Sequence, residues 1–217
     1  MSLPLGLAPP LDAALPELRR DLKLIADWVE PGSRVLDIGC GDGALLAYLA
    51  NVKGVDGRGM ELSQEGVNAC VRNGLSVIQG DADNDLEAYP ADAFDYVVLS
   101  QTLQATRRPR MVLESLARIG RRAIVSVPNF GYWRVRFGLL LTGRMPKSAL
   151  LDHNWYDTPN IHLCTVRDFL GLTRELGLQI EKARMLDHAG HAYGLPADSP
   201  LANWLPEQAV FLLRQAE

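Results

Sequence analysis

The residues best suited to hold a ligand lie between Arg34 and Gly43, which read R-V-L-D-I-G-C-G-D-G. A short apolar strand runs into three glycines at alternate positions, Gly39, Gly41 and Gly43. Without a Cβ, the backbone can turn tightly, and a ligand can approach its N–H groups beside a helix N-terminus. Dinucleotides and S-adenosylmethionine both use this geometry. Gly39, Gly41 and Ala44 also satisfy the dinucleotide fingerprint G-x-G-x-x-G/A.

Asp37 separates these two ligands, because it places a carboxylate two positions before the first glycine. In a dinucleotide-binding fold this position usually belongs to the buried strand and is apolar. A carboxylate there repels a pyrophosphate and attracts the cationic amino group of a methionine moiety. The pattern Asp37-x-Gly39-x-Gly41-x-Gly43 resembles the first motif of class I S-adenosylmethionine-dependent methyltransferases. The alternative is a buried Asp that only caps the following turn.

An acid at the tip of the second strand is the usual partner for a ribose diol. Val52–Asp56 and Arg58–Leu62 both look strand-like, and each contains such an acid. We favour Glu61, because Ser63 is typical of a helix N-cap and the acid should directly precede that helix. Asp56, followed by glycine, is then interpreted as a turn former.

Further polar groups follow the third and fourth predicted strands, Leu75–Gln79 and Phe94–Leu99. Asp81 is best placed to accept a hydrogen bond from the adenine amino group, and Ser100 lies where open α/β sheets bind ligands. The alternating acids that begin at Asp81 could instead form a hydrated loop, a capping array or a weak metal site. The glycine and distal glutamate of a calcium loop are missing. The predicted cofactor-binding residues are Asp37, Gly39, Cys40, Gly41, Gly43, Glu61, Leu62, Asp81, Ala82 and Ser100.

The order of elements predicts an α/β fold. Strand and helix patterns alternate five times, followed by a helix, a strand, a long Gly/Pro loop and a last strand. This order is typical of a doubly wound, Rossmann-like sheet of seven mostly parallel strands whose last strand inserts antiparallel. Dehydrogenase sheets have no reason to end this way. We expect one domain over 1–217, with a lead-in and amphipathic helix at 1–30 and a cap insertion at 130–164.

The composition limits the classes of partner. The 217 residues carry a formal net charge of −4, so no basic surplus is available to neutralise nucleic-acid phosphates. The three cysteines form no C-x-x-C pair, which argues against metal and disulfide scaffolds and fits a reducing cytosol. No apolar run approaches the roughly 18 residues of a membrane span, and no secretory signal is evident. We expect a cytoplasmic protein without metal, nucleic-acid or membrane partners.

Four stretches together resemble the methionine-biosynthesis protein W (MetW) family over roughly residues 20–187. They read V-L-D-I-G-C-G-D-G, G-R-G-M-E-L-S-Q-E-G-V, S-V-P-N-F-G-Y-W-R-V-R and N-W-Y-D-T-P-N-I-H-L-C-T. The last two are not general methyltransferase motifs. The resemblance implies a methyltransferase-like fold, S-adenosylmethionine or S-adenosylhomocysteine as ligand, and a role in methionine synthesis tied to homoserine O-acyltransferase. It does not establish a methyl acceptor.

Candidate catalytic bases are His153 and His162, in an irregular segment that could close over the site, although surface or packing roles fit them equally well. The segment Phe130–Tyr156 concentrates aromatic residues, Met and Arg, the types enriched at interface cores. It is expected to be a lid, a partner interface or a satellite core. Three functions stay open: a small-molecule methyltransferase, a non-catalytic partner-activating subunit that senses S-adenosylmethionine, and, resting only on the dinucleotide fingerprint, an NAD-dependent oxidoreductase.

Overall fold

The computed structural model describes residues 18–148, 150 and 153–216. Residues 1–17 of the predicted lead-in and helix at 1–30 lie outside them, as do residues 149, 151 and 152 of the predicted cap. The helices and strands are α1 (Arg20–Trp28), β1 (Arg34–Ile38), α2 (Ala44–Lys53), β2 (Asp56–Glu61), α3 (Gln64–Arg72), β3 (Val77–Gln79), β4 (Phe94–Ser100), α4 (Pro109–Ile119), β5 (Gly120–Pro128), α5 (Trp133–Thr142), α6 (Val166–Glu175), β6 (Leu178–Leu186), β7 (Ala192–Tyr193) and β8 (Gln208–Gln215), with the short 3₁₀ helices η1 (Leu86–Ala88), η2 (Leu103–Ala105) and η3 (Pro200–Asn203).

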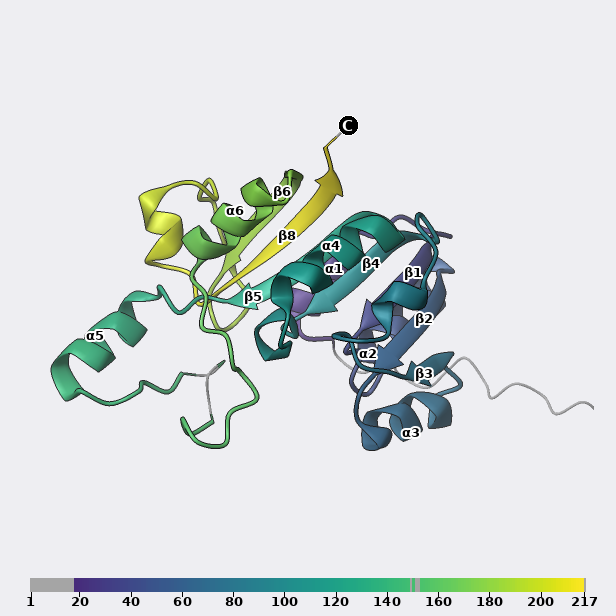
Figure 1. Ribbon diagram of the computed structural model, residues 1–217, viewed down its shortest axis with the longest axis horizontal. Helices are drawn as coiled ribbons and strands as arrows, with labels where there is room; N and C mark the ends of the chain where they lie inside the picture. The colour runs from purple at the N-terminus through teal and green to yellow at the C-terminus, as the bar shows by residue number, and fades with distance from the viewer. Residues whose placement is uncertain (1–17, 149, 151–152, 217) are drawn as a thin grey trace, which may run out of the picture.

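One sheet forms the centre of the molecule, in the order β3-β2-β1-β4-β5-β8-β6-β7 (Figure 1). Strands β1 to β5 pair in parallel, and β8 inserts antiparallel between β5 and β6. The predicted doubly wound sheet with an antiparallel last strand is therefore confirmed. The two-residue strand β7, which pairs with β6, makes the sheet eight-stranded where seven strands were predicted.

Helices cover both faces of the sheet. Alternate residues of β1 face opposite sides: Leu36 joins a core cluster built with α4 and α6, whereas Val35 joins one built with α1 and α2. In the first cluster, Phe169 of α6 stacks on Phe211 of β8 with ring centroids 4.5 Å apart. Because both faces of the sheet are covered by helices, successive residues of a central strand are all buried, and the buried strands are nearly continuous apolar runs.

The second strand, β2, begins four residues after the first of the two strands predicted for this region, Val52–Asp56. Val52 lies in α2, which ends at Gly54 with φ +62°, and β2 starts at Asp56, paired with Arg34. The interpretation of Asp56 as a turn former is therefore wrong. The glycine after it serves packing instead, since a Cβ at Gly57 would lie 3.0 Å from a Leu46 methyl group. The predicted place of Glu61 at the tip of this strand is confirmed, and so is the Ser63 N-cap, which accepts a hydrogen bond from the Gly66 N–H.

The segment predicted to be irregular, 130–163, contains a ten-residue helix, α5. Its apolar residues are spread around the helix rather than along one face, so the sequence lacks the helical periodicity that would have predicted it. Figure 1 shows α5 beyond the end of β5, away from the sheet. Leu140 and Leu141 on α5 are 75% and 79% exposed. Among the described residues, no helix is both long and apolar enough to cross a membrane.

Candidate functional site

The turn from β1 into α2 forms an open cradle at the carboxyl edge of the sheet. All three of its glycines have positive φ, but only one faces free space. A Cβ at Gly39 would lie 2.6 Å from the Thr102 hydroxyl, and one at Gly43 would lie 2.4 Å from Leu75. A Cβ at Gly41 would meet nothing within 4 Å. Gly39 and Gly43 therefore serve close packing, whereas Gly41 leaves room for a ligand.

Two cavities meet at Gly39, which lines both of them. The first, about 170 Å³, adjoins Asp37, Cys40, Gly41 and Ser100. The second, about 340 Å³, is lined by the other predicted residues Leu62, Asp81 and Ala82. The structure thus brings eight of the ten predicted cofactor-binding residues to one continuous edge of the sheet. Gly43 and Glu61 line neither cavity.

Asp37 is the most perturbed acid of the cradle. Its side chain is only 3% exposed, and burial, together with the negative charge of Glu61, raises its pKa to about 7. Among the described residues, no hydrogen-bond donor offsets this shift. The Asp37 carboxylate therefore favours a cation at the adjoining 170 Å³ cavity, because a positive charge there would stabilise the ionised form.

Glu61 ties the cradle to the start of α3. Its carboxylate accepts hydrogen bonds from the backbone N–H groups of Gly41 and Ser63, each at 2.9 Å. A Cβ on Gly66 would lie 2.7 Å from the Glu61 side chain, so α3 packs tightly against this acid. Because a carboxylate has about four acceptor sites, two of them stay available for further donors.

The acids after β3 form a capping array, one of the alternatives that the sequence left open. The Asp81 carboxylate accepts hydrogen bonds from the Asp83 N–H at 2.9 Å and the Asn84 amide at 2.7 Å. Asp83 in turn accepts from the backbone N–H groups of Arg107 and Arg108, both at 2.8 Å. These bonds fix the loop beside the 340 Å³ cavity while Asp81 still lines it.

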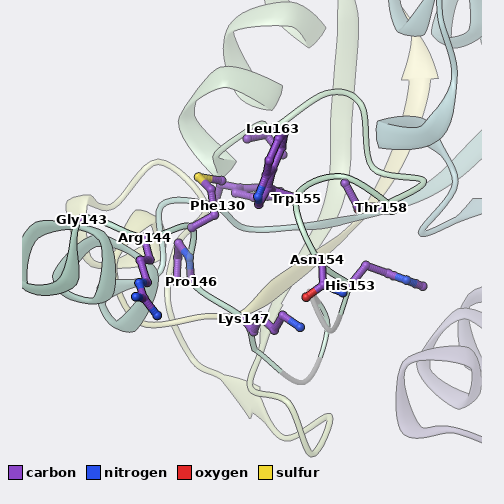
Figure 2. A pocket seen from close by; sticks show the side chains of 11 residues that line it. Phe130, Gly143, Arg144, Pro146, Lys147, His153, Asn154, Trp155, Thr158 and Leu163 are labelled. Carbon is purple, nitrogen blue, oxygen red and sulfur yellow. The ribbon is translucent and has the colours of Figure 1, made fainter.

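The two candidate histidines occupy different positions. His162 is exposed, and its backbone N–H donates to the Gln104 carbonyl at 2.9 Å. His153 lines two further cavities, of about 740 and 500 Å³. Figure 2 shows the larger one, where the His153 side chain extends away from Phe130 and Trp155. Of the two histidines, His153 is the one that faces a cavity.

Sequence reasoning missed the polar residues of the 500 Å³ cavity. Gln101 follows β4 with φ +50°, an uncommon conformation for a residue other than glycine. Its side-chain amide donates to the Gln208 amide oxygen at 2.6 Å, and Gln104 donates to the Gln101 carbonyl at 2.6 Å. Arg19 forms a two-pronged pair with the buried Asp21 at 3.0 and 3.2 Å. The sequence does indicate these residues, because the mostly polar stretch 100–104 lies at the end of β4, but the predicted site includes only Ser100 of this stretch.

Comparisons with known proteins show which protein family the chain is similar to. Residues 19–213 match the family described as methionine biosynthesis protein MetW. The bifunctional methionine biosynthesis protein MetXA/MetW of Rhodopirellula baltica is 36% identical over 174 residues, which are 76% of this chain and 28% of that protein. The chain spans 28–33% of the length of the curated relatives it matches.

Solved structures show the same fold. An S-adenosylmethionine-dependent methyltransferase from Mesorhizobium loti has a TM-score of 0.66 at 17% identity, with 95% of this chain and 100% of that chain covered. The [4+2]-cyclase SpnF has a TM-score of 0.62 at 18% identity, with coverage of 91% and 81%. The fold is therefore the Rossmann-like class I methyltransferase fold. Since one neighbour is a cyclase, the fold alone does not establish methyl transfer.

The family match extends further than the resemblance expected from the sequence, which ended near residue 187. It continues through residue 213 and so includes most of β8, the strand that distinguishes this sheet from a dehydrogenase sheet. Because the match covers most of the chain and the fold agrees with it, the chain belongs to the MetW family.

Proposed function

We propose that this chain binds S-adenosylmethionine or S-adenosylhomocysteine across the two cavities that meet at Gly39. Asp37 holds the methionine ammonium, Glu61 the ribose hydroxyls, and Asp81 the adenine amino group. The observation that carries the proposal is the buried Asp37 carboxylate, which lines the same cavity as the open face of Gly41, where a ligand cation would offset the cost of burying its charge. The fold neighbours support the same ligand class.

Calorimetric titration tests this assignment against the dinucleotide alternative. We expect S-adenosylhomocysteine to bind and NAD to give no heat, because the Asp37 carboxylate would repel a pyrophosphate. Replacing Asp37 by Asn removes the charge while keeping the shape, so it should weaken S-adenosylhomocysteine by about tenfold or more. Binding of NAD, or unchanged affinity in Asp37→Asn, would contradict the assignment.

We further propose that the chain acts in methionine biosynthesis together with homoserine O-acyltransferase. The name of the Rhodopirellula baltica relative joins MetXA to MetW in one protein, which supports a physical association. The surface proposed for it is the C-terminal end of α5, where Leu140 and Leu141 are largely exposed. Large exposed apolar groups on a projecting helix mark interaction sites.

The N-terminal part of α5, around Arg136, is held by contacts within the chain. The exposed residues Leu140 and Leu141 near its C-terminal end are therefore better positions for testing partner binding. Arg136 donates to the Gly131 carbonyl at 2.5 Å and lies 4.6 Å from the Trp204 ring centroid. Replacing Arg136 would therefore disturb the helix itself. Replacing Leu140 and Leu141 by Glu changes only exposed side chains and places charges where a partner would bury apolar surface.

Co-purification with a tagged homoserine O-acyltransferase tests the association. We expect wild type to co-elute and Leu140→Glu/Leu141→Glu to lose the acyltransferase while keeping affinity for S-adenosylhomocysteine. Val71→Glu is the matched control, since Val71 is 60% exposed on α3 at the other end of the sheet. If the double variant keeps its partner and loses the cofactor, α5 belongs to a lid and the partner proposal fails.

A second candidate function is methyl transfer to an acceptor of its own. The 500 Å³ polar cavity favours it, because Arg19 lines both that cavity and the one beside Asp37. Methyl transfer is an in-line displacement at the sulfonium, so positioning an acceptor there supplies most of the catalysis. Incubation of the protein and a cell extract with radiolabelled S-adenosylmethionine tests this function. Label should enter an acceptor with wild type and not with Gly41→Val.

A further inference from the structure

The 500 Å³ cavity is a built polar site rather than a surface hollow. We call it the glutamine pocket and define it by Arg19, Arg20, Asp21, Gln101, Gln104 and Gln208. Asp21, Gln104 and Gln208 are 4%, 6% and 3% exposed, so three polar side chains are buried in its walls. Buried polar groups are costly unless they are paired, and a pocket lined by them is suited to a polar ligand.

Hydrogen bonds hold these walls in fixed positions. The Gln101 side-chain amide donates to Gln208 at 2.6 Å and to Asp21 at 3.4 Å, joining the end of β4 to β8 and α1. Gln101 does this from a backbone with positive φ, a conformation that persists only where its surroundings enforce it. Strained residues of this kind cluster at ligand sites, and here the strain lies at the carboxyl end of a central strand.

Among the described residues, one buried acceptor in this pocket lacks a donor. The Oε1 atom of Gln104 is buried and has no hydrogen-bond partner in the described part of the chain, although the Nε2 atom of the same amide donates to the Gln101 carbonyl at 2.6 Å. An unpaired buried oxygen destabilises the fold unless something donates to it. A ligand ammonium or hydroxyl group would supply that donor once the Gln104 side chain turns its oxygen toward the cavity that it lines.

The charged groups of the pocket favour an anion as the second ligand group. Arg19 is balanced by Asp21, with which it pairs at 3.0 Å. Arg20 contacts the Nε2 atom of His191, which must act as the acceptor because a guanidinium only donates. The other His191 nitrogen faces the Asp187 carboxylate at 3.1 Å, so the ring lies between Arg20 and that acid and orients the guanidinium. Among the described residues, His191 is the side-chain partner of Arg20, and the further N–H donors of a planar guanidinium are suited to a carboxylate.

We propose that the glutamine pocket binds a small L-α-amino acid, with its carboxylate at Arg20 and its ammonium at Gln104. The proposal rests on the proposed function for its place beside the cofactor, since Ser100 lines the cavity at Asp37 and Gln101, the next residue, lines the glutamine pocket. The pocket and the cofactor site are therefore adjacent, and an amino acid in one lies beside the sulfonium end of a cofactor in the other.

Binding to the loaded protein tests this proposal. The twenty proteinogenic L-amino acids are titrated one by one into full-length protein saturated with S-adenosylhomocysteine, with NMR saturation transfer as the readout. At least one should bind with a Kd of about 1 mM or below. Its carboxamide and its deaminated analogue should each bind about tenfold more weakly or worse, because each lacks one of the two charged contacts.

Two variants and one control locate the binding site. Arg20→Met and Gln104→Leu should each weaken the amino acid by about tenfold or more. Both should keep their affinity for S-adenosylhomocysteine. Arg20 is exposed, so its replacement leaves the fold intact even if the buried Gln104→Leu unfolds. Arg174→Met on α6 removes the same charge from an exposed position outside the pocket and should change nothing.

The outcomes separate this proposal from the one on the cofactor. If S-adenosylhomocysteine binds and no amino acid does, or if Arg20→Met leaves amino-acid affinity unchanged, the glutamine-pocket proposal is wrong and the cofactor assignment stands. If S-adenosylhomocysteine itself fails to bind, the proposed function fails, and the same titration on the unloaded protein still tests the pocket. Amino-acid binding that requires Arg20 supports the proposal in either case.

Discussion

The cradle proposed to bind the cofactor and the glutamine pocket are neighbours, but the chain builds them in opposite ways. The cradle comes from one continuous region: Asp37, Gly41 and Glu61 lie at the ends of β1 and β2, and Asp81 follows β3. The glutamine pocket joins Arg20 of α1 to Gln208 of β8, at the two ends of the described chain. Local sequence therefore specifies the first site, whereas the second exists only once β8 has inserted beside β5.

The largest loss of affinity for S-adenosylhomocysteine is expected from a substitution at Gly41, at the centre of the cradle. Gly41→Val should weaken S-adenosylhomocysteine by more than about a hundredfold, because the branched side chain enters the space left for the ligand. Circular dichroism should show a largely intact fold, and calorimetry the loss of binding.

Backbone strain is the competing explanation for that loss, and Gly54 controls for it. Gly54 has φ +62°, close to the +57° of Gly41, and a Cβ there also meets nothing within 4 Å. It lies at the end of α2, outside both cofactor cavities. Gly54→Val should therefore suffer similar strain and still bind. If the two variants lose binding equally, Gly41 serves backbone geometry rather than ligand access.

The next largest effect concerns the acid at the tip of β2. Glu61→Ala should weaken binding by roughly ten- to a hundredfold or more, since hydrogen bonds to charged groups contribute roughly 1.5–3 kcal/mol each. The variant also frees the Gly41 and Ser63 N–H groups that Glu61 now engages. Asp56→Ala is the matched control, because Asp56 lies at the opposite end of the same strand and pairs only with Arg58 among the ion pairs of the described residues. Loss of binding in Asp56→Ala with none in Glu61→Ala would reverse the assignment.

The same contrast explains what could be predicted from the sequence. The positions of Asp37, Gly41 and Glu61 at one edge of the sheet were predictable because strand ends and glycine turns are short-range patterns, and parallel pairing brings consecutive strand ends together. Gln101 and Gln208 meet across 107 positions, so no local pattern links them. The helix α5 was missed because its apolar residues follow no single face, and the start of β2 because Gly57 was interpreted as a turn residue.

A smaller effect on the affinity for S-adenosylhomocysteine is expected from a change in pH. The proposed contact between the ligand ammonium and Asp37 requires an ionised carboxylate, and burial raises the pKa of Asp37 in the free protein to about 7. Below that value the carboxyl must release a proton before it can bind the cation, so affinity falls with pH; above it, affinity levels off. Lowering the pH from 8 to 6 should weaken S-adenosylhomocysteine about tenfold. Asp37→Asn should bind weakly and show no such dependence. A flat profile in wild type would mean that Asp37 stays ionised or does not contact the ligand.

The smallest effect is expected on the stability of variants in α5, which lies away from both ligand sites and exposes Leu140 and Leu141. Leu140→Ser/Leu141→Ser should change the free energy of unfolding by less than about 0.5 kcal/mol, because both side chains are largely exposed in the isolated chain. Leu113→Ala on α4 is the opposite case: Leu113 is fully buried, and its truncation should cost about 2–5 kcal/mol. Urea unfolding of the three proteins measures both values. A large loss in the α5 variant would mean that these leucines are already packed within the chain, and the surface proposed for the acyltransferase would then not be free to bind a partner.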